Sequence, residues 1–212
     1  MLGSVQRNVR QMRLLYRDEG SGANQSLSVR GKAVVNILKA NITNADIFGG
    51  EARLIDDISR YGSRGILLGE ENMCAVLSTN DKSFFKLPGG GIDLGERESD
   101  AFMREVLEET GCKCQIIKQL GTISEHNGRS NFCQFSFVFL AKKTGEQGKQ
   151  SLTKEEKALD FTLRWMTLED ARNTFLNAFS SCTDIKQRFM MKRELTIVEY
   201  LIESIKSGEI IL

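Results

Sequence analysis

Three glutamates near the middle of this 212-residue chain have the spacing that an α-helix would place on one face. Glu105, Glu108 and Glu109 are related as i, i+3 and i+4, and such neighbours on a helix have Cβ atoms about 5–6 Å apart. Because like charges at this separation repel, the arrangement requires a counter-charge. Mg²⁺ prefers oxygen ligands and is commonly held by carboxylates together with substrate phosphates. The spacing therefore predicts a divalent-metal site.

Three glutamates in a short run are weak evidence on their own, because exposed helices often carry a solvated acidic face. The neighbouring charges also have simple alternatives. Arg104 could form an i,i+4 surface pair with Glu108, worth roughly a few tenths of a kcal/mol. Glu96 could interact favourably with the dipole at a helix start. What distinguishes this segment is that glycines and charges recur at fixed offsets between Gly90 and Gly111.

Residues 90–112 resemble the Nudix box, G-x5-E-x7-R-E-U-x-E-E-x-G-U, in which U is a bulky aliphatic residue. The one departure is Cys112 in the last aliphatic position, and cysteine behaves as a small buried hydrophobe. The resemblance covers about residues 60–170 and does not extend to residues 1–50. Every charged and glycine position of the pattern is matched, by Gly90, Glu96, Arg104, Glu105, Glu108, Glu109 and Gly111.

The resemblance implies hydrolysis of a nucleoside diphosphate linked to another group, with Mg²⁺ or Mn²⁺ as cofactor. By position in the box, Glu105, Glu108 and Glu109 are the expected metal ligands, and Glu96 is a further ligand or a supporting residue. Bound metal ions would neutralise the pyrophosphate, lower the pKa of a bound water and align the reacting groups.

Two further roles follow from the same resemblance. Glu105 occupies the position assigned as general base in several members of the family, and Arg104 would orient a glutamate through a paired hydrogen bond. Gly89, Gly90 and Gly91 would allow close backbone approach to the substrate. We therefore expect Glu105 and Arg104 to be catalytic and the three glycines to bind substrate.

The substrate is less well defined than the reaction. ADP-ribose members of the family usually carry a proline after the box, whereas Pro88 is the only proline in this chain. Dinucleoside polyphosphate members often have a nearby tyrosine, and none lies between Tyr61 and Tyr200. A general nucleotide class remains, which includes nucleoside triphosphates and their oxidised forms. The alternative function is a Nudix-like module that senses a nucleotide without cleaving it, although such modules usually lose box carboxylates.

The elements around the box are expected to be strands mixed with a few helices. Pro88 and the glycines after it indicate a sharp passage from a strand through a loop into a helix. That helix is expected at about residues 98–110, with Gly111 as a left-handed cap. Phenylalanines that alternate with other residues predict a strand at 131–141. The other expected strands are 53–55, 64–68, 73–78, 84–87, 113–117 and 161–166.

Two helices are expected near the C-terminal end. Thr167 and Asp170 resemble a capping box that opens a helix to about Phe179, and Thr183 or Asp184 could cap a longer helix that ends near residues 207–208. Strands and helices without regular βαβ alternation indicate an α+β fold. The resemblance refines this to an α/β/α sandwich with a mixed sheet, an N-terminal extension and a long C-terminal helix.

Residues 1–50 are expected to form an N-terminal arm or extension, and residues 51–212 the Nudix domain with its C-terminal helices. Residues 1–17 contain four arginines and no acidic residue. This composition fits either an organellar presequence or a basic arm on a cytoplasmic protein, and the second interpretation is preferred. Five cysteines without C-x-x-C spacing indicate free thiols in a reducing compartment.

The overall charge gives no sign of a polyanionic partner, since 29 Lys+Arg residues face 28 Asp+Glu residues. We therefore expect neither nucleic acid nor an anionic membrane surface as a partner. No apolar run approaches the length of about 20 residues that a membrane-spanning helix needs. The expected partner is a small-molecule nucleotide. An apolar stripe at the C-terminal end predicts either core packing or a homodimer interface, and it consists of Val198, Leu201, Ile202 and Ile205.

Outside the box, the candidate site residues are weaker. Glu155 and Glu156 could reach the metal site, although a solvated loop is the simpler interpretation of a KEEK run. His126, the only histidine, either borders the pocket or lies on the surface, and the surface is favoured. Three aromatic residues could stack on a nucleobase, but core packing is the stronger interpretation for Phe84, Phe85 and Trp165.

Overall fold

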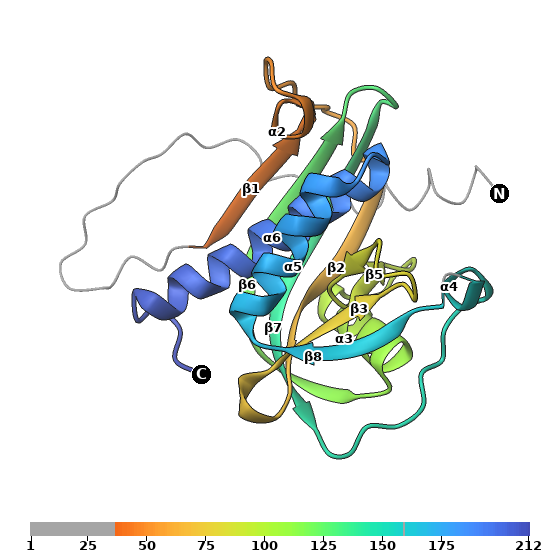
Figure 1. Cartoon of the computed structure of the whole chain (residues 1–212), viewed down its shortest axis with the longest axis vertical. Helices are drawn as coiled ribbons and strands as arrows, with labels where there is room; N and C mark the ends of the chain where they lie inside the picture. Colours follow the sequence, from red (N-terminus) through yellow and green to blue (C-terminus); the bar gives the residue numbers. More distant parts are fainter. Residues whose placement is uncertain (1–36, 159) are drawn as a thin grey trace.

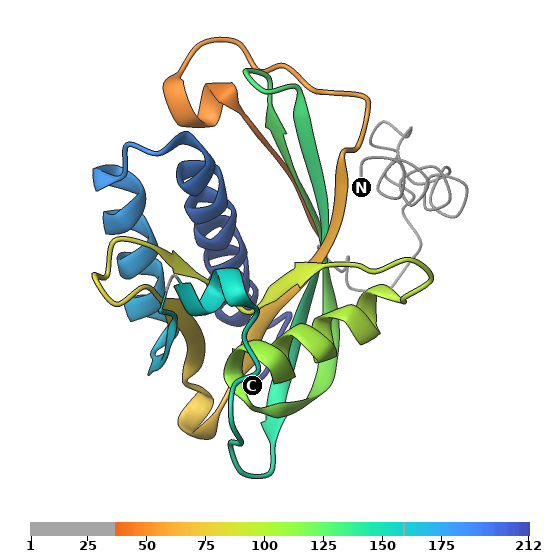
Figure 2. The same cartoon turned by 90° about the vertical axis from the view of Figure 1, so that its right-hand side faces the viewer.

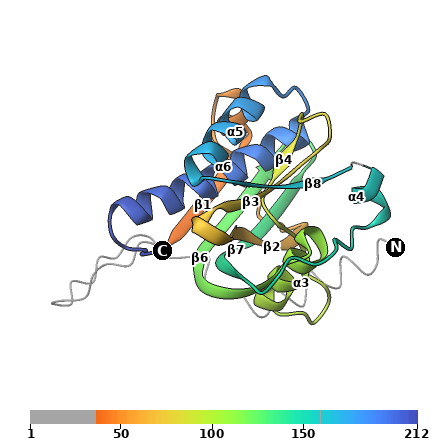
Figure 3. The same ribbon diagram turned by 60° about the horizontal axis from the view of Figure 1, so that its bottom comes forward.

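The computed structural model describes residues 37–158 and 160–212, drawn in colour in Figure 1. A mixed sheet lies between two helical layers. The helices α5 (Leu168–Ser181) and α6 (Ile185–Lys206) cover one face, and α3 (Glu98–Thr110) covers the other (Figures 2 and 3). The predicted α+β class and α/β/α sandwich are thereby confirmed.

The sheet runs in the order β1-β6-β7-β2-β3-β4, with β5 paired to β2 and β8 paired to β3. The pairs β1–β6 and β2–β7 are parallel, and the other pairs are antiparallel. The strands are β1 (Leu38–Thr43), β2 (Arg60–Leu68), β3 (Cys74–Ser78), β4 (Phe85–Lys86), β5 (Gly89–Gly91), β6 (Lys113–Asn127), β7 (Phe132–Thr144) and β8 (Thr162–Met166).

One edge of strand β2 pairs with β7 along its whole length, whereas the other edge pairs first with β5 and then with β3. Gly62, Ser63 and Arg64 pair with β5, whereas Leu68 at the far end pairs with Cys74 of β3. Between β4, which pairs with β3, and β5, which pairs with β2, the chain passes through Pro88. The glycine segment is consequently held against the N-terminal part of β2, directly before the chain enters α3.

The helix boundaries follow the capping signals of the sequence. Gly111 ends α3 with φ 72°, in the left-handed region. The side chain of Thr167 accepts a hydrogen bond from the Asp170 backbone at the start of α5. Asp184 rather than Thr183 caps α6, because its side chain accepts from the backbone of Gln187. The predicted helices are therefore confirmed, including the long C-terminal one.

Two apolar layers hold the sandwich together. On the α3 side, the rings of Phe102 and Phe139 stack with centroids 5.4 Å apart. On the other side, Val198, Leu201 and Ile202 of α6 are buried against the sheet. Burial of a large apolar side chain contributes about 1.5–3 kcal/mol. The C-terminal stripe therefore packs in the core, as the first of its two interpretations stated.

Strand β6 is longer than the predicted 113–117 and extends to Asn127. The register against β7 shifts between Ile116 and Lys118 and again between Gln119 and Gly121. These irregularities break the period-two pattern on which a strand prediction depends. The apolar positions of this segment therefore do not alternate along the chain as they would in a regular strand.

Two predictions for the N-terminal part differ from the structure. Residues 53–55 do not form a strand, because the Ile55 backbone N–H donates to the His126 ring at 3.0 Å instead of to a strand. Residues 38–43 fall within the expected arm but form β1, which pairs with β6 from Leu38 to Thr43. Part of the range 1–50 is thus built into the sheet, and the division at residue 50 stays a prediction. The basic segment 1–17 lies outside the described residues.

The connections are short and mostly irregular. They include the helix α2 (Asn44–Phe48), the 3₁₀ turn η1 (Glu70–Asn72) between β2 and β3, and α4 (Lys154–Ala158). Across residues 37–158 and 160–212, the structure has no helix that is both long enough and apolar enough to cross a membrane.

Candidate active site

Arg104 is the centre of the charged group that the box brings together. Its guanidinium donates to both carboxylate oxygens of Glu96, at 2.8 and 2.9 Å. It also donates to Glu105 Oε1 at 2.8 Å, to Glu108 Oε2 at 3.2 Å and to the carbonyl oxygen of Gly91 at 3.0 Å. The surface pair with Glu108 is therefore only one arm of a network that ties the glycine segment to α3.

This network shifts the pKa values of Glu96 and Arg104. The hydrogen bonds from Arg104 hold the pKa of Glu96 below its ordinary value. The same bonds to Glu96, followed by those to Glu105, raise the pKa of Arg104. Arg104 thus supplies a fixed positive charge amid three carboxylates, which relieves the repulsion expected from their spacing.

Glu109 lies apart from the other two helix glutamates. Its side chain is 2% exposed, against 41% for Glu108. It forms a buried ion pair with Lys86 Nζ and accepts a hydrogen bond from the Gly89 backbone N–H at 2.8 Å. Burial raises the pKa of Glu109 to about 7, and Lys86 acts in the opposite direction. The three glutamates therefore meet different environments although the helix places them close together.

The three glycines of β5 make room for charged side chains. A Cβ atom on Gly89 would lie 2.4 Å from the Cβ atom of Arg64, and Gly89 also has a φ of 141°, which favours glycine. A Cβ atom on Gly90 would lie 2.3 Å from Glu105 Oε1. The glycines therefore allow close packing against the protein's own charged side chains, and their approach to a substrate stays a prediction.

A cavity of about 680 Å³ opens beside this network, between β5, α3, the end of the β6–β7 hairpin and α6. Its size falls within the usual range for small-molecule sites. The box contributes Gly90, Gly91, Arg104, Glu105 and Glu108 to the wall, and Gly89 directly before it also lines the cavity. The remaining lining residues are Arg60, Arg64, Lys86, Glu125, Asn127, Ser130, Phe132, Gln134, Thr153, Lys186, Phe189, Met190 and Arg193.

The donor set is suitable for a hard divalent cation. Glu105 and Glu108 present carboxylate oxygens to the cavity, which are the ligands that Mg²⁺ and Mn²⁺ prefer. Among the described residues, no three carboxylate, imidazole or thiol groups converge as they would around a bound ion. Arg104 and Lys86 hold the carboxylates instead. To bind a metal at this site, Glu105 and Glu108 would have to release their hydrogen bonds to Arg104 and coordinate the ion instead.

A buried charge cluster forms the deep wall of the cavity. Glu194 of α6 accepts from Arg193 at 2.5 Å and from Arg64 at 3.4 Å. Arg193 also donates to Glu125 of β6 at 2.5 Å. With its amide oxygen turned toward the two guanidiniums, Gln134 accepts from both at 3.0 and 3.1 Å. Burial, followed by repulsion from Arg193, lowers the pKa of Arg64 to about 10.

Sequence reasoning missed these residues, although a signal was present. Glu194 falls on the helical continuation of the apolar stripe, four residues before Val198, where a solvated charge would not be expected. Lys86 likewise stands alone in an apolar run, between Phe85 and Leu87. A charge at a core position indicates a buried partner, but its partner cannot be identified from spacing along the chain.

The weaker candidates have structural environments of their own. His126 is buried, contrary to the preferred surface placement, and its Nε2 lies 2.8 Å from Ser124 Oγ. Burial lowers the pKa of His126. Phe84 is buried in the core, while Phe85 and Trp165 pack against core clusters, as favoured. The side chains of Glu155 and Glu156 lie outside the described part of the structure.

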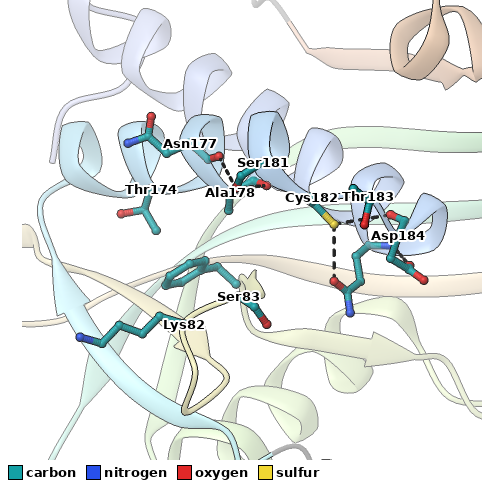
Figure 4. A pocket seen from close by; sticks show the side chains of 11 residues that line it. Lys82, Ser83, Thr174, Asn177, Ala178, Ser181, Cys182, Thr183 and Asp184 are labelled. Atoms are coloured by element: carbon teal, nitrogen blue, oxygen red, sulfur yellow. Dashed lines mark hydrogen bonds between the residues drawn. The ribbon is translucent and has the colours of Figure 1, made fainter.

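A second cavity, of about 540 Å³, lies between the β3–β4 loop and the α5–α6 corner. Figure 4 shows the residues that line it, with Cys182 and Asp184 near the start of α6. Asp184 is occupied by its capping bond to the Gln187 backbone. None of the box residues lines this cavity, so the box chemistry belongs to the larger one.

Comparison with known proteins agrees with this architecture. The NUDIX domain family pattern matches residues 58–182, which is more than half of the chain. The chain therefore belongs to the Nudix family.

One curated relative is a putative 8-oxo-dGTP diphosphatase of Bacillus subtilis strain 168, 31% identical over 86 residues. The match spans 41% of this chain and 55% of that relative. Among solved structures, a NUDIX hydrolase from Nitrosomonas europaea has a TM-score of 0.50 at 16% identity, covering 70% of this chain and 89% of that one. The NUDIX domain of Shewanella oneidensis NrtR, solved with ADP ribose, has a TM-score of 0.47 at 16% identity, with 74% and 90% covered.

Proposed function

We propose that this protein is a Mg²⁺-dependent pyrophosphohydrolase that cleaves the pyrophosphate bond of a nucleoside diphosphate derivative. The observation that carries this proposal is the joint placement of Arg104, Glu105, Glu108 and the glycine segment on one cavity of about 680 Å³. The cavity wall thus combines carboxylates that can bind a cation with a glycine backbone that a phosphate group could contact closely.

The metal would be Mg²⁺, with Mn²⁺ as a substitute, held by Glu105 and Glu108 and supported by Glu109 and Glu96. When bound, such an ion neutralises phosphate charge and lowers the pKa of a coordinated water. The work of the protein is then positioning and electrostatics, which is what phosphoryl chemistry mainly needs.

The remaining roles belong to the chain's own side chains. Glu105 lies against Gly90 on the cavity wall and takes the proton of the attacking water as general base. Arg104 orients Glu96 through two charge-assisted hydrogen bonds. Gly90 and Gly91 line the cavity beside these carboxylates, where the phosphate chain would bind.

The cavity also carries positive charge that forms no ion pair with a carboxylate in the described part of the chain. Arg60 and Lys186 line it and have no ion-pair partner among the described residues. Both side chains belong to exposed residues, so they remain hydrated until a polyanion arrives. We assign them to the phosphates of the substrate, because Lys and Arg are the usual phosphate-binding cations.

Nucleoside triphosphates, including oxidised forms, are the substrate class that we favour. The name of the Bacillus subtilis relative supports a nucleotide of this kind. All five cysteines are free thiols, which supports a reducing compartment such as the cytoplasm. The expected partner is therefore a small-molecule nucleotide.

The test is a substrate panel with Mg²⁺, in which nucleoside triphosphates, sugar nucleotides and dinucleotides are incubated with the protein and separated by chromatography. We expect a nucleoside monophosphate and pyrophosphate from at least one triphosphate. Binding of a nucleotide without any turnover across the panel would instead establish the nucleotide-sensing module, the alternative function.

A further inference from the structure

The buried charge cluster of Arg64, Arg193, Glu125 and Glu194 is not explained by stability alone. Burying ion pairs costs desolvation energy that their attraction often fails to recover, and apolar residues of similar size usually serve as well. The buried positions one turn away on α6, Phe189, Ile197 and Val198, are indeed apolar. A cluster of this kind at the wall of a cavity suggests a function in that cavity.

Three groups in the cluster lack a hydrogen-bond partner among the described residues, and two of them, on Arg193 and Glu125, adjoin the cavity; the third is Glu194 Oε2. Arg193 is 1% exposed, and its Nε–H makes no hydrogen bond. Glu125 uses Oε2 to accept from Arg193, while Oε1 accepts from no described residue. Both residues line the cavity. A carboxylate acceptor and a guanidinium donor thus stand next to each other on the same wall, with hydrogen-bonding capacity left over.

The side chains around this pair suit a flat ring. Phe132, Phe189 and Met190 line the same cavity, and the ring of Phe132 belongs to a residue that is 39% exposed. Ligand sites commonly combine apolar and aromatic walls with a few placed polar groups. The box lines the same cavity, so one ligand could contact both the box and this pair.

We propose that Glu125, Gln134 and Arg193 form a subsite that reads the polar edge of a guanine-type nucleobase. Glu125 accepts from the N1–H and 2-amino groups, while Arg193 donates to the adjacent carbonyl oxygen. The edge of adenine carries an amino donor and an unprotonated ring nitrogen. Its amino group would therefore face the donor Arg193, and its ring nitrogen would face the acceptor Glu125, so neither hydrogen bond could form. This assignment rests on the proposed function for the identity of the ligand as a nucleotide.

The first test uses the unaltered protein and needs no turnover. Binding of dGMP, dIMP and dAMP is measured by calorimetry, because monophosphates contain no pyrophosphate bond to cleave. We expect dGMP to bind about tenfold or more tighter than dAMP, as a well-matched base edge provides. The dissociation constant of dIMP should lie between the two, because hypoxanthine keeps N1–H and the carbonyl but lacks the 2-amino group.

The second test identifies the residue. Glu125→Gln keeps the shape of the side chain and should bring dGMP and dAMP to within about threefold of each other. Glu203→Gln, the same change at a side chain that is 75% exposed on α6, should leave the preference intact. Circular dichroism checks that both variants are folded, and the three-ligand comparison on the unaltered protein decides the proposal if Glu125→Gln is not.

Equal binding of dGMP and dAMP by the unaltered protein, or no binding of either, would overturn the subsite. So would a folded Glu125→Gln variant that keeps the guanine preference. The proposed hydrolysis is tested separately by product formation. A guanine preference without turnover would support the subsite and contradict the proposed hydrolysis. Turnover without a base preference would support the hydrolysis and contradict the subsite.

Discussion

Lys86 and Glu109 form a buried ion pair that joins the short strand before Pro88 to the last turn of α3. The Gly89 backbone N–H donates to the second oxygen of the same carboxylate. The segment directly before the box and the end of its helix are thereby joined independently of Arg104. Glu109 consequently holds the glycine segment in place as well as being a candidate metal ligand.

The pair predicts how stability depends on pH. Burial raises the pKa of Glu109 from 4.5 to about 7. Between these values the folded state binds the proton that the unfolded state releases, so the free energy of unfolding decreases as the pH rises through this window. The slope is at most about 1.4 kcal/mol per pH unit. We expect Glu109→Gln, which cannot titrate, to lose this contribution to the slope.

The measurement is chemical denaturation of both proteins at several pH values from about 4.5 to 8, with chelator present. His126 has a lowered pKa, so its contribution is lost as the pH falls below its ordinary value, which is the opposite sign. It is common to both proteins and cancels in their difference. A difference in unfolding free energy that does not change with pH would contradict the raised pKa of Glu109.

Glu108 separates catalysis from folding better than Glu109 does, because its side chain is 41% exposed. We expect Glu108→Gln to lower kcat about a hundredfold or more, on the scale of a lost charge-stabilising group. The unfolding free energy should stay within about 0.5 kcal/mol of the original. Glu203→Gln serves as the exposed control. A fall in kcat of less than about threefold would show that Glu108 is only a surface charge.

Gly90→Ala tests the close approach of the glycine segment to the general base. The new Cβ atom would lie 2.3 Å from Glu105 Oε1, so Glu105 must move. A displacement of this order can lower the rate about a hundredfold. Gly145→Ala is the matched control, since it has open space around it but a φ of 69°. It should cost about 1 kcal/mol of stability and leave kcat unchanged. Equal kcat values for the two variants would argue against the role of Glu105.

Local signals predicted much of this fold. The box helix, its glycine cap and the capping residues of α5 all depend on neighbours within a few positions, and the structure places them as expected. The end of β6 could not be predicted in the same way, because its register shifts against β7 depend on the partner strand. Residues 38–43 were similarly hidden, since β1 exists through its pairing with β6.

Part of the site could likewise be predicted from local spacing and part could not. The residues of the box are recognisable from spacing because they all lie within one loop and one helix. Arg193 and Glu125 are 68 positions apart in the chain, and Lys86 and Glu109 are 23 apart. Such pairs form only when the sheet and α6 come together. A charge at an apolar position indicates that a partner exists, but the identity of that partner is a property of the packing.

The N-terminal segment provides a test of the expected arm. A truncated protein that begins at Ser26 leaves β1 complete, so we expect kcat/KM to stay within about threefold of the full chain. Removal of residues through Thr43 deletes β1, which pairs with β6 along its whole length, and should prevent stable folding. If the Ser26 truncation folds but loses activity about tenfold or more, the segment contributes to the pocket or to an obligate dimer.

The central claim is that the box carboxylates perform metal-dependent pyrophosphate cleavage in the cavity beside α3. The most direct measurement is the initial rate of nucleoside triphosphate hydrolysis by the full chain as Mg²⁺ is titrated in, with Glu105→Gln measured alongside. We predict no turnover in excess chelator, a saturable rise with Mg²⁺ or Mn²⁺, and a loss of about a hundredfold or more for Glu105→Gln at saturating metal. Turnover that persists undiminished in chelator, or a Glu105→Gln variant as fast as the original protein, would contradict the account.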